Sequence, residues 1–100
     1  MNNNQSDIET ARPGSFFRAN PDVLAQRLDD VIVLVHLQTD RILELNRTAA
    51  RLWELLGSGC NRSQIQQQML QEFDVTEKQL TEEIDNCLSW LLAEDLVSVY

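Results

Sequence analysis

Few side chains in this chain of 100 residues are of a type that carries covalent or metal chemistry. The only histidine is His36, and the two cysteines, Cys60 and Cys87, have neither CxxC spacing nor a neighbouring histidine, so zinc binding is not expected. Ser58 stands in Gly-Ser-Gly-Cys, which lacks the strand–GxSxG–helix context of a nucleophilic serine. We therefore expect no catalytic residue, no metal site and no cofactor.

The charge of the chain points in the same direction. The formal net charge is −8, and residues 61–100 carry Arg62 and Lys78 against eight acidic side chains, a net of −6. A nucleic-acid-binding protein needs a basic face, because phosphate contacts supply most of its affinity. We expect no nucleic acid as a partner, and an acidic face suits a basic peptide or a basic patch on another protein.

The N-terminal region differs in composition from the rest. Residues 1–20 are mostly polar and are predicted to be a flexible tail, and residues 21–100 are predicted to form one domain. Phe16 and Phe17 are the exception in the tail, where one ring is expected to rest on the core. The first 15 residues lack the apolar region of a signal peptide, and the longest aliphatic run covers only residues 31–35. A cytoplasmic protein without membrane contact is expected.

Three β-type segments precede the helices. They are residues 22–28, the strongly apolar run 31–37 and the short segment 41–45, with turns at 29–30 and 38–40. Such short connections predict an antiparallel meander. The run 31–35 is apolar at successive positions, so both faces of the middle strand are apolar, and the face away from the helices needs cover from a second copy, the N-terminal tail or a partner protein.

Three helices are predicted after the strands. Asn46 is a good N-cap for the first helix, and glycines at 57 and 59 end it. Asn61 with Gln64, and Thr76 with Gln79, have the spacing of capping boxes for helices over residues 62–73 and 77–94. The fold class is therefore predicted to be α+β and winged-helix-like, with a three-stranded antiparallel sheet followed by a three-helix bundle.

The direct junction between the third strand and the first helix suggests a binding function. If the segment 41–45 is an edge strand, its outward N–H and C=O groups are unpaired, and an extended peptide can add there as another strand. The last helix is apolar on both shoulders, since Trp90 and Leu92 each lie about 100° from Leu91 on the helical repeat. One shoulder can line a groove, or both can pack laterally against the other helices.

The same residues resemble those of the PqqD-like family. The resemblance is carried by Leu37, Arg41, the junction Leu45-Asn46 with Thr48 and Ala49, the run Trp53 to Leu56, and Glu72 to Val75. It covers roughly residues 22–99, and its most distinctive part is the junction L-N-x-T-A-x-x-x-W-E-L-L. One departure is Asp40, which occupies a turn position where the family often has glycine.

The resemblance implies a stand-alone peptide-recognition element of pathways that modify ribosomally made peptides. The leader of the precursor would bind as a further strand beside the last helix, and the domain, without catalysis of its own, would present it to a modifying enzyme or a leader protease. A lasso-peptide-type pathway and a radical-enzyme pathway both agree with the resemblance. The residues carried over as peptide-binding are Arg41, Ile42, Leu43, Glu44 and Leu45 on the strand, and Thr81, Asp85, Leu88, Ser89 and Leu92 on the Leu92 shoulder of the helix.

Two other functions remain open at the level of sequence. The chain could be a structural or oligomerising subunit of an enzyme complex, for example a homodimer that uses the apolar outer face of its sheet. It could also be a winged-helix DNA-binding regulator, with the last helix in the major groove. Glu77, Glu82, Glu83 and Asp85 on that helix argue against DNA binding.

Overall fold

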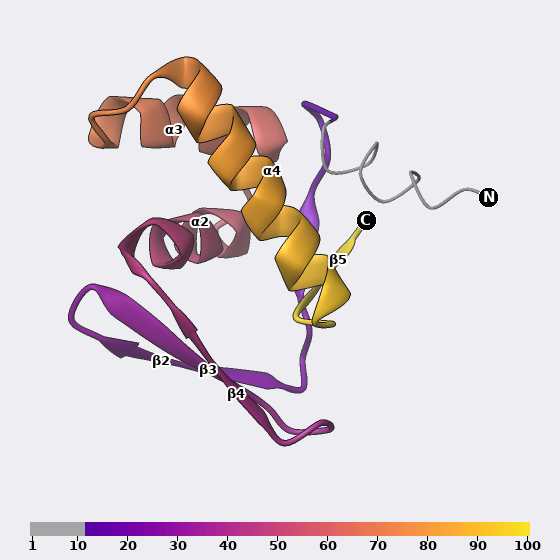
Figure 1. The fold of residues 1–100 in the computed structure, drawn as a ribbon. Helices are drawn as coiled ribbons and strands as arrows, with labels where there is room; N and C mark the ends of the chain where they lie inside the picture. Colours follow the sequence, from indigo (N-terminus) through magenta and orange to yellow (C-terminus); the bar gives the residue numbers. More distant parts are fainter. Residues whose placement is uncertain (1–11) are drawn as a thin grey trace.

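The three predicted strands form one antiparallel sheet in the computed structural model, which describes residues 12–100 (Figure 1). Asp29 and Asp40 occupy the turns with positive φ angles of 56° and 59°. Aspartate tolerates this left-handed conformation because its short polar side chain can hydrogen-bond locally. Asp40 can therefore fill the turn position at which the resembling family often has glycine. The sheet order is β2-β3-β4, formed by Val23–Leu28, Val31–His36 and Arg41–Leu45.

The helices begin where the capping residues predict. The Asn46 side chain accepts a hydrogen bond from the Ala49 backbone N–H, and Asn61 and Thr76 each form a complete capping box. Within residues 12–100, no helix has both the length and the apolar composition that crossing a membrane would require. The three helices are α2 (Arg47–Gly57), α3 (Arg62–Glu72) and α4 (Glu77–Ala93).

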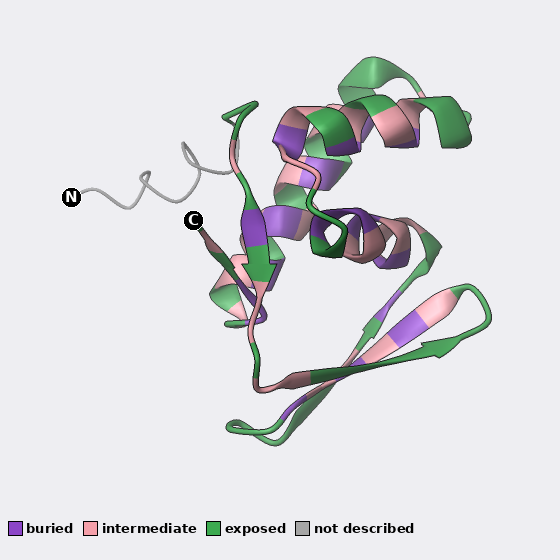
Figure 2. Cartoon of the chain, turned by 180° about the vertical axis from the view of Figure 1, so that it is seen from behind, coloured by how far each residue is buried: buried purple, intermediate pink, exposed green. Residues whose placement is uncertain are grey.

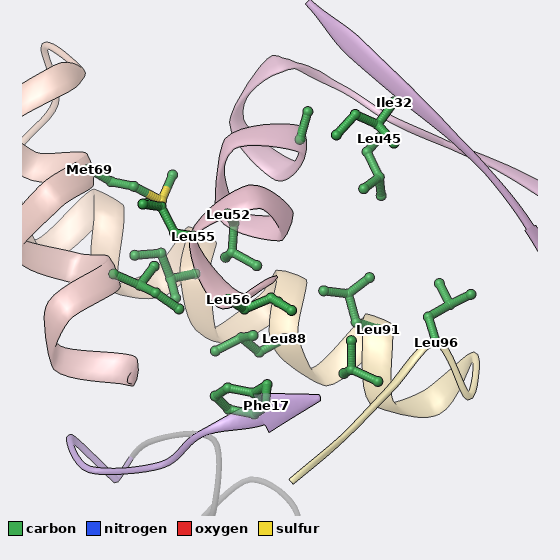
Figure 3. Packing of buried hydrophobic residues seen from close by; sticks show 14 of the residues in the cluster. Phe17, Ile32, Leu45, Leu52, Leu55, Leu56, Met69, Leu88, Leu91 and Leu96 are labelled. Carbon is green, nitrogen blue, oxygen red and sulfur yellow. The ribbon is translucent and has the colours of Figure 1, made fainter. Parts of the chain in front are cut away.

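All three helices lie on the same side of the three-stranded sheet (Figure 1). Alternation along β3 turns Ile32, Leu34 and His36 towards the helices, where all three are buried. Figure 3 shows side chains from the sheet, α2, α3 and α4 meeting in one apolar cluster. The predicted α+β class, with three antiparallel strands followed by three helices, is confirmed.

A second, smaller sheet joins the two ends of the domain. Strand β1 (Phe17–Ala19) pairs antiparallel with β5 (Val97–Val99), and Phe17, which is 2% exposed, points into the core (Figure 3). Strand β1 thus lies inside the segment predicted to be a tail, and the part of that prediction covering residues 1–11 falls outside the described residues. A three-residue strand has too little alternation to be recognised, and its partner is 80 positions away in the chain.

His36 is fully buried. Its Nδ1 accepts a hydrogen bond from the Gln38 backbone N–H at 3.3 Å, and its Nε2 lies 3.3 Å from Asp95 Oδ2. With Nδ1 acting as the acceptor, the neutral ring carries its proton on Nε2, which donates to Asp95. His36 therefore links the larger sheet to the turn between α4 and β5, which is a structural role.

Candidate binding site at the β4 edge

Strand β4 is an edge strand, as predicted. It pairs with β3 on one side, and no strand among residues 12–100 pairs with its other side. Leu45 is buried and Leu43 half-buried against the helices, whereas Ile42 and Glu44 are exposed on the opposite face. A peptide added at this edge would therefore be held first by the β4 backbone.

A cleft of about 530 Å³ lies beside this edge, between the β4–α2 junction and α4. Its buried parts include Leu52 and Ile84, and Trp90 is 37% exposed. Most of the lining is apolar, which suits an apolar side chain entering from an added strand. The lining consists of Glu44, Leu45, Asn46, Thr48, Ala49 and Leu52 on the β4–α2 side, and Glu83, Ile84, Cys87 and Trp90 on α4.

Two features hold the walls of the cleft in place. Asn46 follows β4 directly and caps α2, so no loop separates the edge strand from the first helical wall. Arg41 at the start of β4 forms an ion pair with Glu94, just after α4, with an N–O distance of 2.7 Å. The edge strand is thus tied to both helices, and its backbone groups are positioned before any ligand arrives.

The α4 residues that were predicted to bind the peptide do not line this cleft. Thr81 Oγ1 accepts a hydrogen bond from Gln66 Nε2 at 2.9 Å, and Asp85 pairs with Arg62 at 2.9 Å, so both side chains face α3. Leu88 is fully buried in the core. Ser89 and Leu92 are half-buried and do not line the cleft. The structure places the cleft on the Trp90 shoulder of α4 and not on the Leu92 shoulder that was adopted from the sequence.

Sequence reasoning missed most of the cleft lining on the helices. Asn46, Thr48 and Ala49 were recognised only as parts of a helix start, and Glu83 only as part of an acidic face. The available signal was Trp90, a large apolar residue off the core stripe of its helix. The apolar pattern of α4 is two-sided, so the choice of shoulder depends on where α3 packs.

Comparison with known protein families decides the membership of this chain. The profile of the family described as "Coenzyme PQQ synthesis protein D (PqqD)" matches residues 32–97, which is more than half of the chain. The chain belongs to the PqqD family. The matched range runs from β3 through β5, so it contains both the β4 edge and the cleft of this PqqD-family domain.

Two solved structures share this fold. One is TbiB1 in complex with the TbiA(beta) leader peptide, with a TM-score of 0.78 and 26% identity, covering 83% of this chain and 96% of that chain. The other is lasso peptide synthetase B1 complexed with the leader peptide, with a TM-score of 0.76 and 22% identity, covering 82% and 96%. No curated protein matches this PqqD-family domain significantly.

Cys87 contributes an apolar surface to the cleft of this PqqD-family domain. Both cysteines are free thiols, and burial raises the pKa of Cys87 to about 11. The thiol is therefore neutral near pH 7 and behaves as a small apolar group. A reactive cysteine would need the opposite shift, because the thiolate is the nucleophile.

A second hollow, of about 140 Å³, lies on the other side of α2 and has a different character. Arg51 donates two hydrogen bonds of 2.7 Å to Glu72, which lower the pKa of that carboxyl group, and Arg27 pairs with Glu54. These charges satisfy one another, whereas the cleft beside β4 offers apolar surface and unpaired backbone groups. The β4 site is therefore the stronger candidate for binding a peptide.

Proposed function

We propose that this PqqD-family domain binds the leader peptide of a ribosomally made precursor and holds it for a modifying enzyme or a leader protease. The observation that carries the proposal is the open β4 edge beside an apolar cleft. The likeness to TbiB1 in complex with a leader peptide supports it, as does membership of the PqqD family. A lasso-peptide-type pathway in the cytoplasm is the setting that we favour.

The proposed mechanism is strand addition. The leader would lie along Arg41–Leu45 and exchange backbone hydrogen bonds with the outer edge of this strand. Every second leader side chain would point towards the helices, where the cleft accepts an apolar group against Ile84, Cys87 and Trp90. The domain would supply affinity and orientation, and the chemistry would belong to the enzyme that receives the leader.

The DNA-binding alternative finds little support on the surface. Glu77, Glu82 and Glu83 are exposed on α4, the helix that would have to enter the major groove. Carboxylates at these positions would repel the phosphate backbone, which normally supplies most of the affinity for DNA. The other alternative, a structural or oligomerising subunit, would need the outer face of the sheet as its interface.

The decisive experiment is a fluorescence-anisotropy titration with labelled leader peptides from short reading frames beside this gene. We expect saturable binding at micromolar affinity or tighter. Strand addition also predicts that N-methylation of the leader backbone weakens binding at every second position, because only alternate N–H groups face β4. Failure of every local leader to bind would contradict leader recognition. If the leader binds but N-methylation does not weaken binding at every second position, strand addition is contradicted and leader recognition is not.

A further inference from the structure

The face of the sheet that points away from the helices carries mostly apolar side chains. Residues directly opposite in an antiparallel pair share a face, and Val35 lies opposite both Leu24 and Ile42. No helix among residues 12–100 covers this face, as the two opposite views show (Figures 1 and 2). The apolar side chains on it are Leu24, Leu28, Val31, Val33, Val35 and Ile42, of which Leu24, Leu28 and Ile42 are 56%, 51% and 72% exposed. Gln26 and Glu44 lie on the same face, on either side of Val33.

Carboxylates lie on this face and at its two ends. Asp29 lies in the turn at one end of the sheet and Asp40 in the turn at the other end, and Glu44 lies opposite Val33 on the outer face, at the β4 edge that borders the cleft. None of these three carboxylates has an ion pair within the described part of the chain. The outer face therefore combines exposed apolar side chains with unpaired negative charge, as the core and rim of a protein interface do.

The arginines of the same strands do not neutralise this rim. Arg27 of β2 pairs with Glu54 of α2, and Arg41 of β4 pairs with Glu94 after α4, so both guanidinium groups turn to the helical side. The two arginines of the sheet are therefore neutralised by carboxylates of the same domain, whereas the carboxylates on the outer face have no such partner among residues 12–100.

This charge distribution decides between the two occupants that an apolar sheet face can have. A second copy would bring the same carboxylates together, between chains that each carry a net charge of −8. Like charges brought together across an interface cost free energy and slow association. A protein with an apolar patch flanked by lysine or arginine side chains would bury the same apolar groups and gain favourable pairs at the rim.

We infer that the outer face of the sheet is a second docking surface, which binds a basic-rimmed apolar patch on the enzyme that receives the leader. That the partner is an enzyme of the same pathway rests on the proposed function. The apolar wall of the cleft and the outer face lie on opposite sides of the sheet and meet at Glu44 on the β4 edge, so leader and enzyme would bind at the same time. The domain would then connect the two by using one side for each.

The test uses the purified full chain and each purified modifying enzyme or protease encoded beside its gene. Biolayer interferometry should detect binding of at least one enzyme, with an association rate that falls as salt rises from 50 to 500 mM. The double variant Leu24→Ser/Leu28→Ser should weaken this binding at least about tenfold, because two apolar groups leave the interface. The variant Gln26→Lys should slow association about threefold, because it adds a positive charge to the outer face, where Gln26 lies opposite Val33.

Tyr100→Ser is the matched control. Tyr100 is 62% exposed and follows β5, so this variant also removes an exposed apolar group, but away from the outer face. It should bind the enzyme as the wild type does. Equal binding by Leu24→Ser/Leu28→Ser and Tyr100→Ser would overturn the inference, and so would the absence of binding to every enzyme tested.

Two further measurements separate the possible failures. Sedimentation equilibrium should give a monomer, and a dimer that Leu24→Ser/Leu28→Ser abolishes would show that a second copy occupies the face, overturning the inference. Leader titrations with the same variants should match the wild type. If the wild type binds an enzyme through the outer face but binds no leader, the proposed function fails while the docking surface stands.

Discussion

The two shoulders of α4 look alike in the sequence and differ in the structure. On one shoulder, Thr81 and Asp85 form hydrogen bonds and an ion pair with α3. On the other, Cys87 and Trp90 line an open cleft beside the edge of β4. A polar side chain with a partner inside the domain supports the fold, whereas an apolar side chain left beside an unpaired strand edge remains available to a ligand.

Helix α4 has a buried central stripe and two shoulders, and each of these three parts has a different role. The buried centre, with Leu88 and Leu91, anchors the helix in the core. Helix α3 packs against the shoulder with Thr81 and Asp85, and the sheet does not cover the shoulder with Cys87 and Trp90. Changes on the α3 shoulder should therefore affect stability, and changes on the cleft shoulder should affect leader binding.

The largest effect is expected from filling the cleft. Cys87→Phe places a ring where an apolar leader side chain would enter, so leader affinity should fall about 100-fold, or about 2.7 kcal/mol. Anisotropy titration measures this change. Asn86→Phe adds the same ring at an exposed position on α4 that does not line the cleft, and it should bind leader normally. Equal losses in the two variants would break the comparison.

The next effect concerns the opposite shoulder. Asp85→Ala leaves the guanidinium of Arg62, a residue that is 5% exposed, without its ionic partner. Unfolding free energy in urea should fall by about 2 kcal/mol, less than for a fully buried pair because the Asp85 side chain is 35% exposed. Leader affinity of the folded protein should not change. Glu82→Ala, an exposed site on the same helix, should alter stability by less than about 0.5 kcal/mol.

Truncation of the cleft rim should have a smaller effect. Trp90→Ala removes the aromatic surface but keeps the cleft open, so leader affinity should fall about tenfold, or about 1.4 kcal/mol. Trp90 is 37% exposed, so loss of its buried part should also lower the unfolding free energy in urea by about 1–2 kcal/mol. Leu92→Ala, on the other shoulder, should lower the unfolding free energy without changing leader affinity in the same titration and urea experiments. A loss of affinity in Leu92→Ala that matched Trp90→Ala would place the site on both shoulders.

The mildest experiment leaves both shoulders intact and follows the thiol of Cys87. The raised pKa, about 11, means that the thiolate fraction is small at pH 8 and grows about tenfold per pH unit until the pH approaches that value. Alkylation by iodoacetamide, measured by mass spectrometry in a Cys60→Ser background, should follow this rise. Saturating leader should slow the reaction severalfold, because it covers the cleft. An unchanged rate would place the leader elsewhere.

Much of the fold is readable from the sequence because its signals are local. The apolar run in β3, the turn aspartates and the caps at Asn46, Asn61 and Thr76 each act within a few residues, and the structure confirms the elements that they predict. The open edge of β4 follows from the order of the strands. The pairing of β1 with β5 was not predictable, because it joins two three-residue strands from opposite ends of the chain.

The sequence by itself determined that β4 is an edge strand joined directly to a helix, and that β3 is apolar on both faces. Only the tertiary structure decided which shoulder of α4 meets the edge strand, and that Val31, Val33 and Val35 are the residues left on the outer face. The physical reason is that periodicity specifies which faces of an element are apolar. Which of those faces is covered depends on contacts between elements that are distant in the chain.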